Sequence, residues 1–177
     1  MSRKQTGAAE GAPLLVSSAH LASGGLPALS EVEFSVTLVV AAYHRWMARC
    51  MAAAGLSQLS PLDVLILHTV RHRDRPKRLA DIALVLDVEE MHLATYSVRK
   101  LEGLGLVSTG RSGKEKVVAV TPAGVDLCTR YGEVREGILV EAVKAMNVSE
   151  ADLSKVAVIL RQLSGTYGQA ARAAATV

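Results

Sequence analysis

The sequence predicts a mainly α-helical protein with one small β-hairpin, and three observations lead to this prediction. Half of the 177 residues are hydrophobic, yet aromatic residues make up only 3%, so the expected core is aliphatic. Apolar residues recur at helical spacing over most of the chain, and few runs have the composition of strands. Two such short runs flank a glycine-containing turn and predict the hairpin.

Residues 1–29 are rich in Gly, Ala, Ser and Pro and have no sustained period, which predicts a flexible arm or a loosely packed extension. The first long helix is expected to begin at Ser30, because Ser30–Glu33 has the form of a capping box. Gly55 is a natural end for this helix. Its apolar residues follow helical spacing: Val36, Val39, Val40, Tyr43, Trp46, Met47, Cys50 and Met51.

Three shorter helices are expected next. The second helix begins at Ser60, a good N-cap followed by proline in the first turn, and Pro76 prevents its continuation. A third short helix covers 79–86, where the leucines and Ile82 have helical spacing. The cap-like tetrad 87–90 starts a fourth helix that runs to about Glu102, with an apolar stripe of Ala94, Val98 and Leu101.

The hairpin follows the fourth helix. Residues 106–109 and 116–120 have the composition of antiparallel strands, and 110–113 is expected to form the turn between them. Thr121 with Pro122 opens a fifth helix, and Ser149 caps a sixth.

The order of these elements predicts a winged helix-turn-helix over residues 57–121. A major groove of DNA admits one helix, which a second helix holds across the backbone, while a hairpin with a basic tip reaches a neighbouring phosphate. The long helices at 30–56 and 122–177 are too apolar on one face to stand alone, which predicts a dimerisation region and a homodimer. Residues 1–29 form the arm.

The positive charge is concentrated in two segments, although the formal net charge is only +3. The first is the loop 71–78, with four arginines and one lysine, for which phosphate contact and simple solvation both remain open. The second is the hairpin, with Arg111, Lys114 and Lys116. Double-stranded DNA is the partner that this distribution favours.

The fourth helix is the expected reading helix. Opposite its apolar stripe lie His92, Thr95, Tyr96 and Arg99, which can form hydrogen bonds with base edges. Lys100 is expected to face solvent or phosphate. The alternative is that this face is simply solvated. The predicted DNA-binding residues are His92, Thr95, Tyr96, Arg99, Lys100, Arg111, Lys114 and Lys116.

Other classes of function have little support in the sequence. Cys50 and Cys128 lie far apart without metal spacing, which favours two reduced thiols in a cytoplasmic protein. Among the histidines only His68 and His72 have helical i, i+4 spacing, and no further ligand lies nearby, so no metal site and no cofactor are expected. No catalytic motif is present, which argues against an enzyme, and no apolar run predicts a membrane span.

Residues 59–124 resemble the multiple antibiotic resistance regulator (MarR) family. The similarity lies in Leu59–Asp63 at the start of a helix, in Ile82-Ala83, in Arg99–Val107 after the reading helix, and in Val118–Gly124, which closes the wing. The resemblance implies a transcription regulator whose intertwined terminal helices form a homodimer and which binds a two-fold operator. It also implies that a ligand or partner shifts the spacing of the two reading helices, with the identity of any small-molecule effector left open.

Two departures from the family bear on how DNA would be bound: the first argues against insertion of a wing arginine into the minor groove but leaves phosphate contact by Arg111 or Lys114 open. The wing of the family usually carries Asp-x-Arg at its tip, whereas the turn here is shorter and Ser112 and Lys114 stand nearest to that pair. The reading helix also begins with Glu89 and Glu90, which lower affinity near phosphates unless they cap the helix or accept hydrogen bonds from cytosine. Glu89, Glu90 and the modest net charge favour the alternative, a protein-interaction module on a winged-helix scaffold that does not bind DNA, whereas the basic loop and wing argue against it.

Overall fold

The computed structural model describes residues 14–177, which are mostly helical and include one small antiparallel sheet, as the sequence predicts. Residues 1–13, and with them the first part of the expected arm, lie outside the described residues. The elements in chain order are α1 (Ala19–Ala22), α2 (Pro27–Ala53), α3 (Pro61–Arg71), a 3₁₀ turn (His72–Asp74), β1 (Lys77–Arg78), α4 (Leu79–Val85), α5 (Met91–Gly103), β2 (Val107–Ser112), β3 (Glu115–Val120), α6 (Pro122–Val134), a π-helical segment (Arg135–Val140), α7 (Glu141–Ala145) and α8 (Glu150–Ala174).

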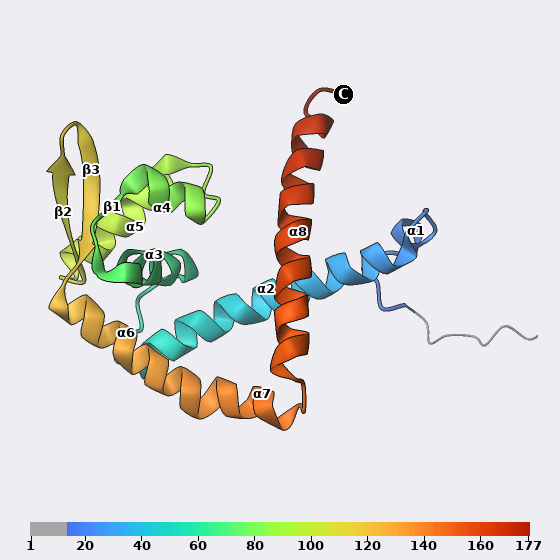
Figure 1. Cartoon of the computed structure of the whole chain (residues 1–177), viewed down its shortest axis with the longest axis horizontal. Helices are drawn as coiled ribbons and strands as arrows, with labels where there is room; N and C mark the ends of the chain where they lie inside the picture. Colours follow the sequence, from blue (N-terminus) through green and yellow to red (C-terminus); the bar gives the residue numbers. More distant parts are fainter. Residues whose placement is uncertain (1–13) are drawn as a thin grey trace, which may run out of the picture.

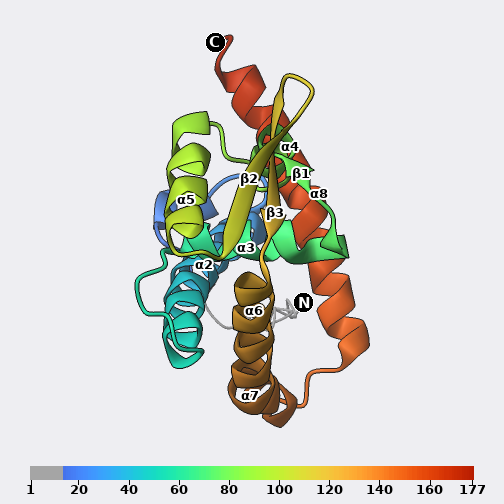
Figure 2. The ribbon, with the colours of Figure 1, turned by 90° about the vertical axis from the view of Figure 1, so that its left-hand side faces the viewer.

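The elements form a lobe with long helices leading away from it. Figure 1 shows α3, α4, α5 and the hairpin gathered at one end, with α2 extending from this lobe and α6 and α7 leading to α8. A hydrogen bond between the Tyr167 hydroxyl and Glu33 Oε1, at 3.2 Å, joins α8 to α2. In the perpendicular view the hairpin stands beside α5, on the side of the lobe that faces the reader (Figure 2).

The sheet has three strands in the order β1-β3-β2, and the sequence predicts only two of them. The additional strand β1 has two residues, Lys77 and Arg78, which pair with β3. The predicted turn at 110–113 is wrong by about two residues. Strand β2 continues to Ser112, which pairs with Glu115, so the tip consists of Gly113 and Lys114. Gly113 has φ +62°, a conformation that glycine adopts without steric penalty.

Two predicted helix starts are wrong, because a side chain that can cap a helix does not always do so. Helix α2 begins at Pro27 rather than at Ser30, and the buried Ser30 hydroxyl donates a 2.9 Å hydrogen bond back to the Leu21 carbonyl. Helix α5 begins at Met91 rather than at the tetrad 87–90. Asp87 has φ +53° and belongs to the turn before the helix.

The other predicted helix ends are confirmed by the observed capping. Ser60 and Asp63 form a capping box at the start of α3, with the Asp63 carboxylate accepting from the Ser60 amide at 2.8 Å. Thr121 caps α6 and Ser149 caps α8 through their hydroxyl groups. The predicted fifth helix continues through the π-helical segment into α7, an irregularity that apolar spacing does not reveal.

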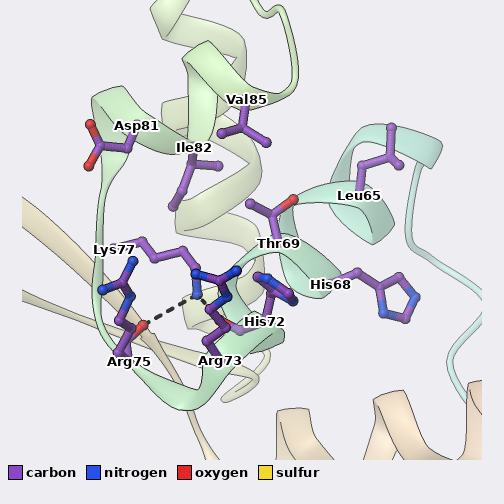
Figure 3. Close-up of a pocket in the computed structure, with 10 residues that line it drawn as sticks. All are labelled: Leu65, His68, Thr69, His72, Arg73, Arg75, Lys77, Asp81, Ile82 and Val85. Carbon is purple, nitrogen blue, oxygen red and sulfur yellow. Dashed lines mark hydrogen bonds between the residues drawn. The ribbon is translucent and has the colours of Figure 1, made fainter. Parts of the chain in front are cut away.

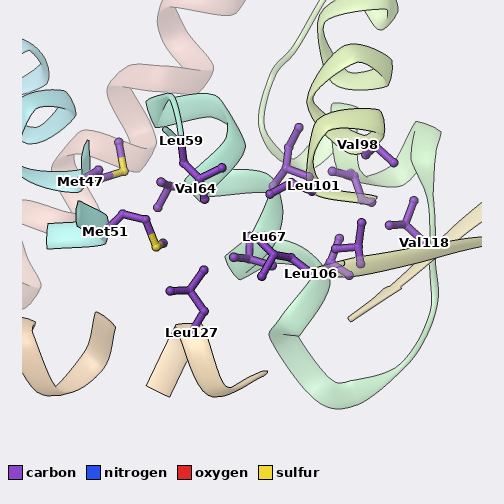
Figure 4. Packing of buried hydrophobic residues seen from close by; sticks show 14 of the residues in the cluster. Met47, Met51, Leu59, Val64, Leu67, Val98, Leu101, Leu106, Val118 and Leu127 are labelled. Atoms are coloured by element: carbon purple, nitrogen blue, oxygen red, sulfur yellow. The ribbon is translucent and has the colours of Figure 1, made fainter. Parts of the chain in front are cut away.

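The hydrophobic core lies in the lobe and is aliphatic. Figure 4 shows side chains from α2, α3, α5, α6 and the sheet converging on one cluster. The predicted stripe of α5 is confirmed, since Ala94, Val98 and Leu101 are all fully buried. Residues that are at most 2% exposed include Met47, Met51, Val64, Ile66, Leu67, Val70, Ile82, Val118 and Leu127.

The long helices contribute unequally to this core. Helix α2 buries Met47, Cys50 and Met51 in its second half, whereas Val39 and Val40 in its first half are exposed. Helix α8 buries no residue at all. Within residues 14–177, no helix combines the length and the hydropathy that a membrane span requires.

Gly124, in the first turn of α6, packs against Leu106, just before β2, and against Val120 at the end of β3. A Cβ atom there would lie 2.1 Å from the Leu106 carbonyl oxygen and 2.9 Å from a Val120 methyl group. We expect Gly124→Ala to lower the free energy of unfolding by about 3 kcal/mol or more, because backbone must move to relieve the overlap. Urea denaturation measures this change.

Gly132 supplies the matched control in the same helix. No atom lies within 4 Å of a Cβ built at this position, so Gly132→Ala should stabilise the protein by up to about 1 kcal/mol through helix propensity. Equal effects of the two substitutions would contradict the close approach of α6 to Leu106.

Candidate nucleic-acid interface

Helix α5 presents the predicted reading face to solvent. His92, Tyr96 and Arg99 are exposed, and Tyr96 retains 70% of its surface. Thr95 lies at the side of this face, half-buried, and its hydroxyl donates a 2.8 Å hydrogen bond to the Met91 carbonyl. The Thr95 oxygen can therefore only accept from a base while this bond holds. The opposite face is anchored in the core, which keeps the reading face outward.

Arg99 is the side chain on this face best suited to contact a base. It is exposed, and it makes no hydrogen bond or ion pair with any residue of the described part of the chain. Its guanidinium has five N–H donors in a planar fork that matches the O6 and N7 acceptors of guanine. A helix inserted into a major groove would bring this fork to the base edges.

His92 lies close to an acidic residue at the start of α5. Its Nε2 is 3.2 Å from Glu90 Oε2, and both side chains are largely exposed. Glu90 occupies the N-cap position but makes no capping hydrogen bond. Glu90 therefore does not cap α5 through its side chain, and its carboxylate contacts His92 instead.

Lys100 does not face solvent or phosphate, and this prediction is wrong. Its ammonium group donates to the Gln58 carbonyl at 2.5 Å and to Asp63 Oδ2 at 2.7 Å. The Lys100 side chain is 29% exposed and the Asp63 side chain only 2%. The lysine thus joins the reading helix to the start of α3 through an ion pair that is largely withdrawn from water.

The surroundings of Asp63 keep its carboxylate ionised. Burial by itself raises the pKa of Asp63, but hydrogen bonds from the Lys100 ammonium and the Ser60 amide outweigh burial and hold the pKa below its usual value. A buried carboxylate without these donors would be strongly unfavourable. Each partner of the Asp63–Lys100 ion pair therefore stabilises the charge of the other.

The wing places three cations together near its tip. Arg111 and Lys116 are directly opposite each other on β2 and β3, so their side chains share one face of the hairpin. Lys114 stands in the two-residue tip. All three line one shallow hollow with Thr109 and Gly110. Like charges held opposite each other repel, so an anion bound against this face would relieve the repulsion and be favourable.

The wing is fastened to the reading helix by a contact that the sequence does not suggest. Glu102 Oε1, in the last turn of α5, accepts hydrogen bonds from the Thr109 amide at 3.1 Å and from the Thr109 hydroxyl at 2.6 Å. These bonds lower the pKa of Glu102, and the nearby Lys116 charge adds to the effect. Helix and wing thus hold a fixed separation at this point.

Two cations of the basic loop 71–78 already have partners within the protein. The Lys77 ammonium donates to the carbonyls of Val70 at 2.9 Å and Arg75 at 3.4 Å, and also to that of His72. Arg78 pairs with Asp81 at 2.8 Å and with Glu115 at 3.3 Å. Figure 3 shows Arg73 and Arg75 beside a hollow between the loop, α3 and α4, with Ile82 and Val85 on its far side. The loop is therefore less available to phosphates than its composition indicates.

His68 and the two cysteines lie in or against the interior of the lobe. The ring centroids of His68 and Tyr131 lie 4.6 Å apart in an edge-on contact, and burial lowers the pKa of His68. Cys50 and Cys128 are free thiols, and burial raises the pKa of Cys128 to about 11, so this thiol is not activated. In residues 14–177, no three His, Cys, Asp or Glu side chains gather as metal ligands would.

Comparison with known proteins agrees with this geometry. A family model for the winged helix DNA-binding domain matches residues 59–124. The transcriptional regulator BldR from Sulfolobus solfataricus is 25% identical, with a TM-score of 0.58 over 75% of this chain and 96% of that chain. A mutant of MarR from E. coli complexed with operator DNA is 13% identical, with a TM-score of 0.64 over 80% and 99%. A MarR-family regulator from a Rhodococcus species is 13% identical, with a TM-score of 0.63 over 75% and 91%. A search of curated proteins gave no match.

The matched domain and the fold define a winged helix DNA-binding protein. More particularly, the fold is that of the MarR regulators over three quarters or more of the chain. The resemblance seen in the sequence is thereby confirmed for the winged helix domain and for the fold.

The Asp63–Lys100 pair makes stability depend on pH in a defined direction. Because the pKa of Asp63 is lowered in the folded protein, the folded state binds fewer protons than the unfolded chain near pH 4. The stabilisation is fully present above about pH 4 and is lost as the pH falls through the folded-state pKa. We expect Asp63→Asn to lower the free energy of unfolding by about 1–3 kcal/mol at pH 7, and the difference from wild type to narrow in acid.

Urea denaturation at pH 7 and at several values below pH 4 measures this narrowing. Asp126→Asn is the matched control, because Asp126 is an exposed carboxylate on α6. If the free energy of unfolding of Asp63→Asn lies below that of wild type by the same amount at all pH values, the assignment of an ionised Asp63 is contradicted.

Proposed function

We propose that the protein is a cytoplasmic transcription regulator of the MarR type that binds a two-fold operator in double-stranded DNA as a homodimer. One observation carries the proposal: an exposed, hydrogen-bonding face on α5 stands beside a basic wing in a winged helix DNA-binding domain. The solved complex of a MarR mutant with operator DNA shares this fold and supports the same use of it here.

In this proposal residues 57–121 bind DNA, and each reading helix enters a major groove. His92, Thr95, Tyr96 and Arg99 contact base edges, with Arg99 reading a guanine. Arg111, Lys114 and Lys116 bind backbone phosphates next to the groove, which supplies affinity without sequence preference. Lys100 drops out of the set of contacts, because its ammonium group already has two partners in the protein.

Residues 30–56 and 122–177 form the dimerisation region in this proposal. Helix α8 has no buried residue despite its length, so it gains little packing energy within one protomer. An apolar cavity of about 550 Å³ lies between α2 and α8, and exposed hydrophobic side chains line and surround it. These are Val32, Leu38, Val39, Val40, Tyr43, Leu153, Val156, Ile159, Leu160 and Tyr167. A second copy of the chain would cover such a surface and generate the two-fold symmetry.

The homodimer leads to a test with one charge placed at two positions on α8. Val156→Glu puts a carboxylate on the apolar face beside the cavity, and burial of an unpaired charge in an interface is strongly unfavourable. We expect wild type to sediment as a dimer at micromolar concentration and Val156→Glu as a monomer. Gln162→Glu, at an exposed position about 120° round α8 from Val156, should remain a dimer. A monomeric wild type would refute the proposed assembly.

The reading face is tested by selection of binding sites from random DNA. Wild type should enrich a two-fold motif, and Arg99→Ala should relax the preference at one position of each half-site. A bidentate contact with guanine contributes on the order of 1–3 kcal/mol of discrimination. Thermal stability should change little, because Arg99 is exposed and has no partner among residues 14–177.

The outcomes of this selection separate the two functions. If wild type enriches no motif, DNA reading fails and a protein-interaction module on the same scaffold takes its place. If a motif appears and Arg99→Ala leaves every position unchanged, another residue of α5 reads the base.

A further inference from the structure

The connector between α2 and α3, residues 54–60, is a well-ordered turn. Gly55 has φ +107°, and the Leu56 amide donates a 3.0 Å hydrogen bond back to the Met51 carbonyl, a bonding pattern that closes helix ends tightly. Ala54 and Leu59 are buried. These contacts hold the connector in one conformation, so a displacement of α2 would be transmitted to the lobe.

Two cationic side chains from other helices hold the two ends of this connector. Arg130 of α6 donates through Nε to the Ala54 carbonyl at 2.8 Å. Lys100 of α5 donates to the Gln58 carbonyl at 2.5 Å and to Asp63 Oδ2 at 2.7 Å. The first contact ties the connector to the helical scaffold, and the second ties it to the reading helix.

The contact with Lys100 differs in kind from the other packing of α5. Ala94, Val98 and Leu101 are held by apolar contacts, which are not directional and tolerate small rotations of a helix about its axis. Hydrogen bonds from one ammonium group to two oxygen atoms are directional. The same Asp63 oxygen also accepts from the Ser60 amide at 2.8 Å, so the acceptor is itself held in place.

We propose that Lys100 is a positioning residue for DNA reading: it sets the rotation of α5 against the α2–α3 connector and so links the reading face to the helical scaffold. The inference rests on the proposed function. Successive residues on a helix are separated by about 100°, so the orientation of Lys100 determines that of its neighbour Arg99. Loss of the tether would let Arg99 sample several approaches to the base edge.

Salt dependence distinguishes a positioning lysine from one that binds phosphate. Removal of a phosphate contact reduces the slope of log affinity against log salt by about one, whereas loss of a positioning contact leaves the slope unchanged. Lys100→Met removes the charge and nearly preserves the length of the side chain. Lys100→Arg retains donors for both acceptors, and Lys114→Met at the wing tip is the matched control.

The experiment measures the binding of full-length protein to its selected operator and to a random duplex over a range of salt concentrations. For Lys100→Met we expect the ratio of specific to non-specific affinity to fall about tenfold, a size typical of coupling through packed contacts, with the slope unchanged. Lys100→Arg should restore most of the ratio. Lys114→Met should reduce the slope and leave the ratio unchanged. A reduced slope or an unchanged ratio for Lys100→Met would overturn the proposal.

Hydrogen exchange of the free protein provides a readout that does not depend on DNA. In Lys100→Met the amides of α5 and residues 55–60 should exchange faster, while those of β2, β3 and α6 keep the wild-type rates. Uniform acceleration, or none, would show that Lys100 has no local positioning role. If wild type selects no DNA motif, the proposed function fails and this measurement alone decides whether Lys100 orients α5. If Lys100→Met does not fold, Asp63→Asn removes the same charge pair and takes its place.

Discussion

The burial of α3 is the constraint on which the lobe depends. Helices α2, α4, α5 and α6 and strand β3 all pack against it, and Val64, Ile66, Leu67 and Val70 are fully buried. Because α3 is covered on so many sides, the elements around it are placed relative to one another through a single body. The reading helix and the scaffold are thus two layers on the same central helix, with the charged group of Asp63 at its capped end.

Much of this architecture follows from local sequence patterns. The helix ends at Ser60, Thr121 and Ser149 could be predicted because side-chain oxygen and backbone amide lie within three residues of each other. The stripe on α5 follows from helical periodicity. The exposed face of α5 is predictable for the same reason, since burial of one side of a helix exposes the other.

The parts that could not be predicted depend on residues far apart in the sequence. Lys100 and Asp63 are 37 residues apart, and no pattern within α5 distinguishes a lysine that turns inward from one that reaches phosphate. Strand β1 has two residues and exists only through its pairing with β3. Ser30 has the sequence context of a cap, yet its hydroxyl reaches Leu21 because the chain before it folds back. In each case tertiary contact overrides the local preference.

Helix α8 shows how separable the two tasks of the proposed dimer would be. Since none of its residues is buried within the protomer, substitutions along its apolar stripe would change association of the proposed dimer more than the folding of the lobe. After a gene duplication, changes confined to α8 and the exposed half of α2 would suffice to stop two sister proteins from mixing. Each could then acquire its own target genes while keeping the same lobe, because in the proposed dimer partner choice and base recognition would reside in different side chains.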